Sequence, residues 1–536
     1  MPPNDGHPPL NPDAAGARFL AATSMLGFFA LASRLLGLAR DMAMAWLLGG
    51  GPMADALVAA MRIPHAMRRL LGEGSLSMLL TAELVRRGRS ESGLRGLGSL
   101  AAALSSRLAL SLAFLTLAAF VFAPWLTTVL TPGFAGGQAA CVTRLMRLCF
   151  PYMFMAGMAG LCMAVLHSLG HFRIPAASPV LFNVVMLFFA GTAAVFHLPP
   201  AETLAVGMLC GGLAQWRMQA ASLRRLLVQA GAISCGAQGA AGTGNGREAW
   251  RRIGRLPCGL LGAAAPQLTM LVAAGFASTL GQGQVAVLYY AERLLELPLG
   301  LTGVCLGMAG LPSLSRFAAA QDYGAFCIQL GCSLRWTTLL ILPACAGLLA
   351  VGQDLVGALL EHGKFDARAA EDTWLALCAY VPALPAAALN RSFLAACYAL
   401  AKGRQAALST CWAVSLTFAG GLAGLPPALA VGAGLWAQTM ALWVTLAAGL
   451  ARLGGGRLAL LDLLPLNILA QQGLGAFSAG LAAQGAMAAL SCADFPCGVW
   501  MALLLAILAG FLAWAAVLWL AGNADIRFFL RKLRQQ

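Results

Sequence analysis

The chain contains 536 residues, of which 60% are apolar and 10% are charged. Ordinary soluble domains are about 45–50% apolar and about 25% charged, so these proportions exclude a soluble globular protein. They also exclude a soluble nucleic-acid binder, which needs far more polar surface. The net charge is +15 and the mean hydropathy is +0.78. Because one membrane-spanning helix takes about 20 apolar residues, the composition predicts a polytopic α-helical membrane protein.

Apolar runs bounded by Gly, Pro and charged residues predict fourteen transmembrane helices. They cover residues 18–48, 54–85, 97–123, 141–168, 175–196, 202–220, 256–280, 285–315, 327–351, 374–400, 405–424, 427–450, 462–490 and 497–521. Residues 1–17 precede them without a single Lys or Arg, so a cleavable signal peptide is not expected. A disulfide between Cys492 and Cys497, which flank a short turn, is left open.

The basic residues lie on alternate connections between these helices. If the N-terminus is cytoplasmic, Arg86–Arg95, Arg217–Arg255 and the C-terminal Arg527–Arg534 all fall on the cytoplasmic side. The connections on the other side are nearly free of Lys and Arg, except Lys364 and Arg368. The positive-inside rule therefore predicts that both termini are cytoplasmic.

An internal repeat divides the helices into two sets of six. Pro151 and Pro382, Arg173 and Arg404, and Arg62 and Arg293 are all separated by the same number of residues. Repeats with the same orientation predict two six-helix lobes related by a pseudo-two-fold axis along the membrane normal, with a substrate cavity between them. Two further helices follow the repeat.

The expected units are a cytoplasmic tail, the first lobe, a basic Gly/Ala-rich cytoplasmic linker, the second lobe, the C-terminal helix pair and a basic cytoplasmic tail. They cover residues 1–17, 18–220, 221–255, 256–452, 453–521 and 522–536.

Charged residues inside the predicted helices are candidates for the functional site, because burying them in a bilayer costs at least about 2.5–3.5 kcal/mol each. They are concentrated in the first, second and eighth helices, and they are Arg34, Arg40, Asp41, Asp55, Arg62, Arg68, Arg69, Glu73, Glu292, Arg293 and Glu296. Bases outnumber acids in this set. Since Arg binds phosphate through two parallel N–H donors, the excess favours a cavity for a phosphate or pyrophosphate group.

A structural role for these charges is the alternative. Arg40 could pair with Asp41 or Asp55 and Arg293 with Glu296, and the Arg68–Arg69 pair could reach the membrane surface. Surface positions near helix ends are the favoured interpretation for Arg144, Arg147, Arg335 and Arg391. Gly72-Glu73-Gly74 and Pro298 interrupt corresponding helices, which is typical of helices that bend to open a cavity.

These residues also resemble a known family, the MurJ (MviN) lipid II flippases of bacterial peptidoglycan synthesis. The resemblance runs in register over residues 18–405 and rests on several segments rather than one. They are 33–41 (Ser-Arg-Leu-Leu-Gly-Leu-Ala-Arg-Asp), 67–74 (Met-Arg-Arg-Leu-Leu-Gly-Glu-Gly), 131–134 (Thr-Pro-Gly-Phe), 150–152 (Phe-Pro-Tyr), 172–176 (Phe-Arg-Ile-Pro-Ala), 289–293 (Tyr-Tyr-Ala-Glu-Arg) and 311–315 (Leu-Pro-Ser-Leu-Ser), together with Asp55 and Tyr398.

The resemblance implies the fold of the multidrug/oligosaccharidyl-lipid/polysaccharide exporter superfamily, and a flippase rather than an enzyme. The implied substrate is lipid II, moved by alternating access from the cytoplasmic to the periplasmic leaflet of the inner membrane, with the tail in a groove of the last two helices. The implied pyrophosphate contacts are Arg34, Arg40, Arg68 and Arg293, with Arg62 in the same candidate set. Asp41, Asp55 and Glu296 would be their acidic partners, and Gly72, Glu73 and Gly74 would form the lateral portal.

The chain departs from the family pattern at four places. His65, Thr81 and Ala286 replace the usual residues, and residues 401–405 replace an Asp-x-x-Thr-Pro run. The last two changes weaken any cation site in the second lobe. No metal or organic cofactor is expected, and coupling to membrane potential or to a sodium or proton gradient is left open.

Four functions remain in competition. The leading hypothesis is export of an anionic lipid-linked glycan by a monomer, and its alternatives are a multidrug/cation antiporter of the same superfamily and a membrane glycosyltransferase. A scaffold for other cell-wall synthesis proteins, alone or as a second role, is the fourth. Excess arginine in the cavity argues against a site for cationic drugs, and a glycosyltransferase would need carboxylates on a larger outside loop. Nucleic acid is not an expected partner.

Overall fold

The computed structural model describes residues 12–71, 93–229, 261–262, 264–452, 463–492, 498–523 and 525–527, and these fold into helices joined by short turns. The first group is α1 (Pro12–Leu48), α2 (Pro52–Leu71), α4 (Gly93–Val121), α5 (Ala123–Leu130), α6 (Gly136–Cys149), α7 (Pro151–Ser168), α8 (Arg173–Val195) and α9 (Pro200–Gln229). The second group is α12 (Ala265–Leu280), α13 (Gln284–Ala319), α14 (Tyr323–Leu360), α15 (Ala367–Tyr380), α16 (Ala383–Ala399), α17 (Gly403–Leu422), α18 (Pro427–Arg452), α20 (Leu466–Cys492) and α21 (Val499–Leu520).

Several helices are long and apolar enough to cross a membrane. Among the described residues, seven stretches meet that requirement, or eight if the bent pair of α15 and α16 is one span. Proline is the first residue of α1, α2, α7, α9 and α18, where it leaves no backbone donor unsatisfied. The chain is therefore a multi-pass, nearly all-helical membrane protein.

Two of the predicted spans are interrupted in the structure. The span expected at 141–168 is divided into α6 and α7 at Phe150, and the span expected at 374–400 is divided into α15 and α16, which meet at an angle of 48°. Both breaks occur at the prolines used to detect the repeat, Pro151 and Pro382. Proline lacks the N–H for the preceding turn and its ring clashes with that turn, which interrupts the helix locally. Residues 136–168 still form one candidate membrane span, whereas α15 and α16 are strongly bent against each other.

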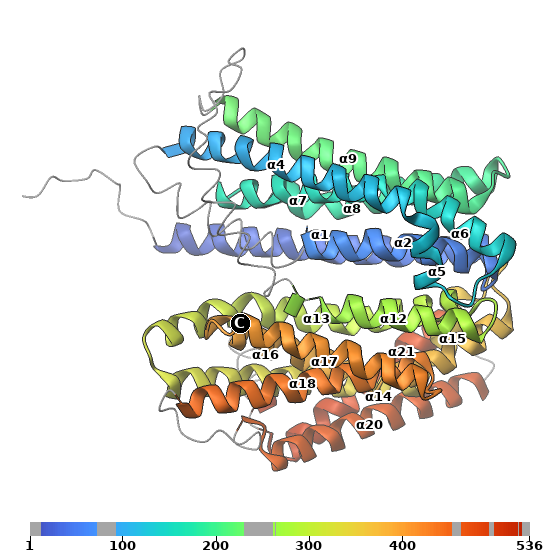
Figure 1. Cartoon of the computed structure of the whole chain (residues 1–536). Coiled ribbons are helices and arrows are strands. Elements are labelled where there is room, and N and C mark those ends of the chain that lie inside the picture. The colour runs from blue at the N-terminus through green and yellow to red at the C-terminus, as the bar shows by residue number, and fades with distance from the viewer. Residues whose placement is uncertain are drawn as a thin grey trace, which may run out of the picture.

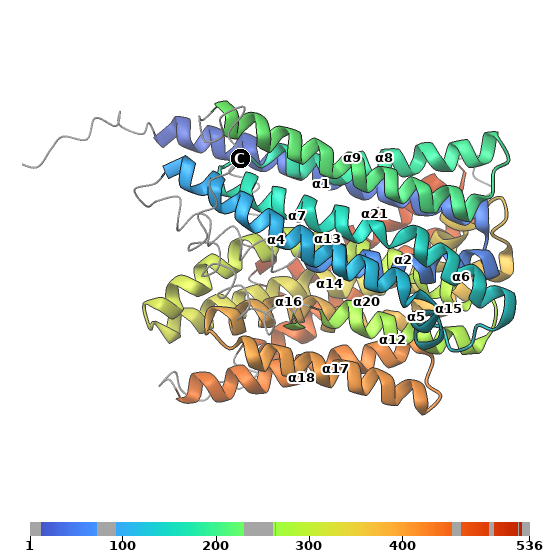
Figure 2. The ribbon, with the colours of Figure 1, turned by 45° about the horizontal axis from the view of Figure 1, so that its top comes forward.

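The helices run roughly parallel and separate into two groups in space. Figure 1 shows α1 to α9 in the upper half of the view and α12 to α21 in the lower half, whereas the two groups overlap in the turned view of Figure 2, with α17 and α18 at its lower edge. One cluster of buried apolar side chains joins the groups and includes Leu57 of α2, Tyr152 of α7, Tyr290 of α13 and Tyr380 of α15. The last two helices, α20 and α21, pack on each other and on α14.

The groups touch closely at the end of the molecule that carries the α1–α2 turn. The amide of Lys364 donates to the carbonyl of Trp46 at 3.0 Å, and the amide of Gly133 donates to Ser278 Oγ at 3.0 Å. Gly283 has a φ of +88°, and a Cβ there would lie 2.0 Å from the carbonyl oxygen of Gly50. Only glycine permits this backbone approach, so the groups are closed together at this end.

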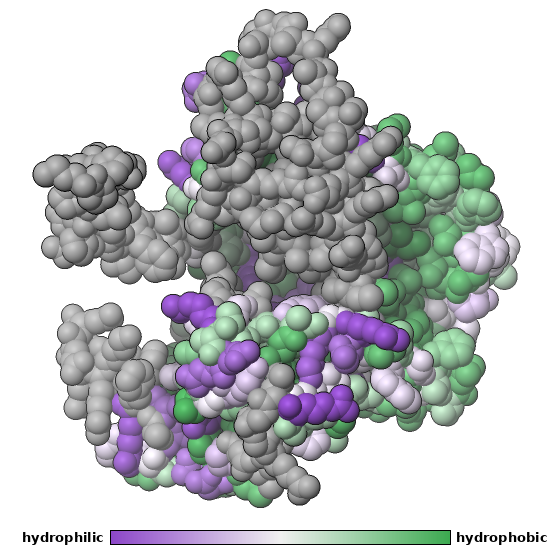
Figure 3. Space-filling model, turned by 60° about the vertical axis from the view of Figure 1, so that its left-hand side comes forward, coloured by the Kyte–Doolittle hydropathy of each residue, from purple (hydrophilic) through white to green (hydrophobic). Residues whose placement is uncertain are grey.

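The opposite end of the molecule carries many of the described basic residues outside the space between the two groups of helices. These include Arg173 at the start of α8, Arg225 near the end of α9, Arg316 near the end of α13 and Arg452 at the end of α18. Figure 3 brings this end forward and shows hydrophilic side chains gathered on it, with hydrophobic side chains on the flank beside it. The segregation matches a protein whose flanks face lipid.

Candidate functional site

A cavity of about 630 Å³ lies between the two groups of helices. Its walls come from α1, α2, α8, α12, α13 and α16. Six arginines and two carboxylates line it, namely Arg34, Arg40, Arg68, Arg69, Arg293, Arg391, Asp41 and Glu296. The excess of guanidinium groups leaves the cavity strongly cationic.

One wall is organised around the Asp41 carboxylate of α1. Asp41 Oδ1 accepts hydrogen bonds from Arg40 Nη2 at 2.8 Å and from the Tyr289 hydroxyl at 3.0 Å. Arg293 of α13 approaches Oδ2 at 3.7 Å and lies over the Tyr289 ring, 4.5 Å from its centroid. Arg40 also donates from Nη1 to Asn183 Oδ1 at 3.1 Å. Two arginines from different helices thus share one carboxylate, which cannot neutralise both.

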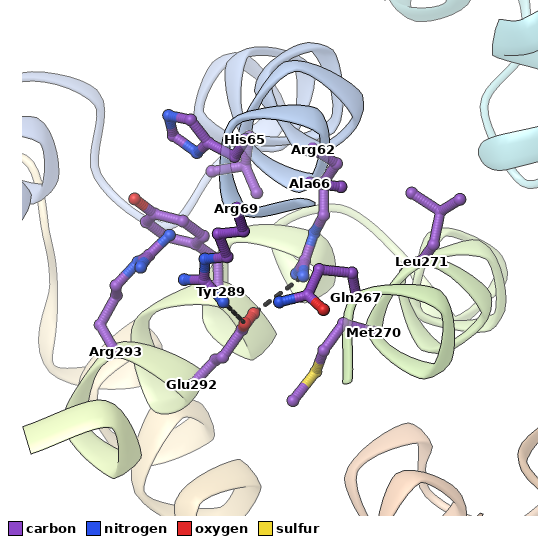
Figure 4. A pocket seen from close by; sticks show the side chains of 11 residues that line it. Arg62, His65, Ala66, Arg69, Gln267, Met270, Leu271, Tyr289, Glu292 and Arg293 are labelled. Atoms are coloured by element: carbon purple, nitrogen blue, oxygen red, sulfur yellow. Dashed lines mark hydrogen bonds and ion pairs between the residues drawn. The ribbon is translucent and has the colours of Figure 1, made fainter. Parts of the chain in front are cut away.

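A second set of ion pairs joins α2 to α13. Arg62 Nη1 donates to Glu292 Oε2 at 2.8 Å, and both side chains are only 9% exposed. One helical turn further on, Arg69 and Arg293 both bind the Glu296 carboxylate, with Arg293 Nη1 at 2.6 Å. Figure 4 shows Arg62, Arg69 and Glu292 turned toward one another in a small pocket of about 30 Å³, which shares Arg69, Arg293 and Gln267 with the large cavity.

Two further arginines bind backbone carbonyls of α13 just after Pro298. Arg34 Nη2 of α1 donates to the Gly300 carbonyl at 2.8 Å, and Arg391 Nη1 of α16 donates to the Leu299 carbonyl at 2.8 Å. A neutral carbonyl is a weaker partner for a guanidinium than a carboxylate or phosphate. These two side chains therefore keep most of their capacity to bind an anion.

Most of the predicted site residues meet in this cavity. Arg34, Arg40, Arg68, Arg293, Asp41 and Glu296 all line it. The expected pairing of Arg293 with Glu296 is present, and Arg40 pairs with Asp41. Arg62 lines the small pocket instead and is tied to Glu292.

Asp55 does not belong to the cavity wall, contrary to its placement among the acidic partners of the arginines. Its fully buried carboxylate accepts hydrogen bonds from the amides of Gly283 at 2.6 Å and Ala286 at 2.8 Å. These amides begin α13, where backbone donors have no partner inside the helix and the helix dipole attracts a negative charge. Asp55 thus holds α2 against the start of α13.

The structure does not describe every residue that the sequence predicts to be functional. Gly72, Glu73 and Gly74 fall outside the described residues, as does Cys497 of the candidate disulfide. The large cavity also contains Arg391, which was expected at the membrane surface, and Asn183 and Gln267, which had no predicted role in the site; Arg69, an intramembrane candidate whose surface position was left open, lines it too. Arg391 was misjudged as a residue near a helix end, whereas it lies in the middle of α16 and donates to the Leu299 carbonyl of α13.

No group of three or more His, Cys, Asp or Glu side chains that could hold a metal occurs in the part of the chain that the structure describes. The site is instead suited to a multiply charged anion. Arginine forks match the oxygens of a phosphate or pyrophosphate, and several of them converge on one chamber.

Comparison with known proteins gives consistent results. The family model described as "Lipid II flippase MurJ" matches residues 44–484. The chain is 32% identical over 370 residues to the lipid II flippase MurJ of Burkholderia cenocepacia, covering 68% of this chain and 69% of that protein. It is 30% identical over 379 residues to the probable lipid II flippase MurJ of Vibrio cholerae, covering 68% and 69%.

Solved structures match the fold over most of the chain. One described as lipid II flippase MurJ in an inward closed conformation has a TM-score of 0.72 at 18% identity, and the match covers 95% of this chain and 100% of that one. A multidrug resistance MATE family transporter of the MOP superfamily, in an inward-facing conformation, has a TM-score of 0.62 at 14% identity, with 81% and 98% covered. Both likenesses concern the fold.

Proposed function

The chain belongs to the lipid II flippase MurJ family, and from this premise we propose that it carries lipid II across the membrane through its arginine-lined cavity. It is a transporter rather than an enzyme. Its role is the supply of lipid-linked precursor for peptidoglycan synthesis, which makes it a component of bacterial cell-wall biogenesis.

The observation that supports this most is the charge of the cavity wall, with six arginines against two carboxylates. The lipid II headgroup is joined to its carrier through a pyrophosphate, which supplies the missing negative charge. A multidrug/cation antiporter is the second candidate, because a MATE transporter shares the fold. A site for cationic drugs needs uncompensated carboxylates, and this wall has the opposite balance.

Arg34, Arg40, Arg68 and Arg293 are the proposed contacts of the pyrophosphate. Asp41 holds Arg40 and Glu296 holds Arg293, and the incoming phosphate oxygens compete with these carboxylates for the same N–H donors. Arg62 and Asp55 act indirectly in this proposal, because their hydrogen bonds join α2 to α13 rather than reaching the pyrophosphate. Gly72, Glu73 and Gly74 remain the proposed lateral portal.

The proposed transport cycle is alternating access between two lobes of six helices, related by a pseudo-two-fold axis, with α20 and α21 completing fourteen spans. The contacts of Gly283 and Lys364 close one end of the molecule, whereas the basic end lies opposite. With the basic end in the cytoplasm, as the positive-inside rule favours, this is an inward-facing state with both termini cytoplasmic. The chain would lie in the inner membrane and act as a monomer.

We also propose the units of the chain, the driving force of the cycle and its partners. The proposed units are the tail 1–17, the first lobe 18–220, the linker 221–255, the second lobe 256–452, the lipid-tail groove 453–521 and the tail 522–536. Membrane potential or a sodium or proton gradient would drive the cycle without any bound cofactor. Other cell-wall synthesis proteins are proposed partners beside lipid II and membrane lipids.

Complementation tests the proposal. A bacterial host depleted of its own lipid II flippase should grow when it expresses this chain or the control Arg316→Ala, whose side chain is exposed at the basic end. Arg34→Ala and Arg293→Ala should fail at equal membrane abundance. Rescue by both cavity variants would refute the pyrophosphate role of these arginines, and failure of the well-expressed wild-type chain would count against lipid II as its substrate.

A further inference from the structure

One arginine far from the cavity has no partner that accounts for its burial. Arg335 lies on α14 and is half-buried, and its Nε is buried without a hydrogen-bond partner. No carboxylate in the described ranges forms an ion pair with its guanidinium. By contrast, Arg144, which is exposed near the other end of the molecule, is paired with Glu202. The two Nη atoms are not among the buried atoms without partners, so their N–H groups can reach an anion outside the protein.

Arg335 faces the seam between α14 and the α20–α21 pair. Gly331 and Leu339, one turn to either side, share its face of the helix. A Cβ on Gly331 would lie 3.3 Å from the Leu463 carbonyl oxygen, and Leu339 packs on Ala479 and Trp514. The arginine is therefore placed where α20 and α21 attach to the rest of the molecule.

The same seam contains further polar atoms without partners. Gln472 of α20 is fully buried and donates through Nε2 to the Arg335 carbonyl at 3.2 Å, which leaves its Oε1 without a hydrogen bond. Trp514 Nε1 of α21 is also buried without a partner. A ligand that completes the seam must offer an acceptor to Arg335 and a donor to Gln472.

The position of Arg335 along α14 indicates where its side chain lies relative to the two membrane surfaces. It precedes Leu360, the last residue of α14, by twenty-five residues. At 1.5 Å per residue this is about 37 Å, which exceeds the hydrocarbon thickness of about 30 Å. With the end of α14 at one membrane surface, Arg335 lies at the headgroup level of the other, on the basic side of the molecule.

We propose that this seam, formed by Arg335, Gln472 and Trp514, binds the headgroup of a membrane phospholipid. The phosphate accepts hydrogen bonds from the Arg335 fork, and an N–H or O–H donor on the headgroup serves Gln472 Oε1. Phosphatidylethanolamine and phosphatidylglycerol carry such a donor, whereas phosphatidylcholine does not. The bound lipid would fasten α20 and α21 to α14. The site is separate from the cavity, so the lipid-binding proposal can be tested independently of the transport function.

The test is lipid binding to the purified, delipidated full chain, followed by native mass spectrometry during titration with each lipid. We expect phosphatidylethanolamine or phosphatidylglycerol to bind about tenfold more tightly than phosphatidylcholine. Arg335→Gln removes the contact with the phosphate and should weaken binding of phosphatidylethanolamine and phosphatidylglycerol about tenfold, a loss of about 1.4 kcal/mol. Arg217→Gln, on the exposed face of α9 at the same end, is the matched control and should bind as the wild type does.

A polyprenyl pyrophosphate lipid is titrated in parallel, because its phosphates could occupy the same site. Arg335-dependent binding of that lipid alone would assign the phosphate site to the transport substrate and overturn the phospholipid assignment. Equal phospholipid affinities of the wild type and Arg335→Gln, or an equal loss of affinity in Arg217→Gln, would overturn the proposed lipid site. If Arg335→Gln does not fold, Arg335→Lys keeps the charge without the fork and should lose part of the affinity.

Discussion

At the scale of single residues, the sequence identified the charges but not their partners. Composition and position in the apolar segments were enough to select Arg34, Arg40 and Arg293 as intramembrane cations, and all three line the cavity. The role of Asp55 could not be obtained in this way, because its hydrogen bonds go to amides more than two hundred residues away. Arg391 was missed for a related reason, because its position along an apolar run does not show that it reaches the Leu299 carbonyl of α13.

The buried Arg62–Glu292 pair makes a prediction about stability. Arg62→Met should lower the free energy of unfolding by about 3 kcal/mol, because it leaves a buried carboxylate whose nearest remaining cation, Arg69 Nη1, is 4.0 Å away. The double variant Arg62→Met, Glu292→Met removes both charges and should recover part of that loss. Thermal melting of the purified protein in detergent measures both effects.

The exposed pair of Arg144 and Glu202 serves as the comparison. Its side chains are 62% and 28% exposed, so Arg144→Met should lower the free energy of unfolding by no more than about 1 kcal/mol. If Arg62→Met melts at the same temperature as Arg144→Met, the link between α2 and α13 does not depend on this ion pair.

At the scale of helices, the observed helices follow the order of the predicted spans where the structure describes them, and seven or eight of the described stretches are long and apolar enough to cross a membrane. A hydropathy profile does not detect the breaks at Pro151 and Pro382, because the residues on either side of these prolines are equally apolar. The bends matter for the site, since α16 begins at one of them and carries Arg391. The prolines themselves were visible in the sequence, and their effect on the helix was the missing step.

The close contact between the α1–α2 turn and α13 makes a prediction at this scale. Ala at position 283 has to adopt a φ of +88° and would place its Cβ 2.0 Å from the Gly50 carbonyl oxygen. Gly283→Ala should therefore separate the two groups of helices at the closed end. We expect a loss of about 1–2 kcal/mol from the dihedral angle and about 1–3 kcal/mol more from the collision, measured by thermal melting.

Gly424→Ala is the matched control for the dihedral cost. Gly424 has a φ of +78°, and nothing lies within 4 Å of a Cβ at that position. Gly424→Ala should show only the smaller loss. Equal melting temperatures for the two variants would show that the contact of Gly283 with Gly50 does not hold the closed end together.

At the scale of the whole molecule, the structure joins two features that the sequence could only suggest separately. The ion pairs of Arg293 with Asp41 and of Arg69 with Glu296, which line the cavity, also join α1 and α2 to α13. An anion that competes for Arg69 and Arg293 therefore weakens contacts between the two groups of helices. Binding and conformational change are linked through the same side chains, which is what alternating access requires.

The central claim is that the cavity arginines bind the pyrophosphate of lipid II, and its most direct test is the equilibrium affinity of the purified chain for lipid II. Arg293→Gln and Arg40→Gln should each weaken binding at least about tenfold, because each removes a charge-assisted contact, and the exposed control Arg316→Gln should not change it. Raising the salt concentration should reduce the wild-type affinity more than that of the two cavity variants. Cavity variants that bind lipid II as tightly as the wild type would contradict the account.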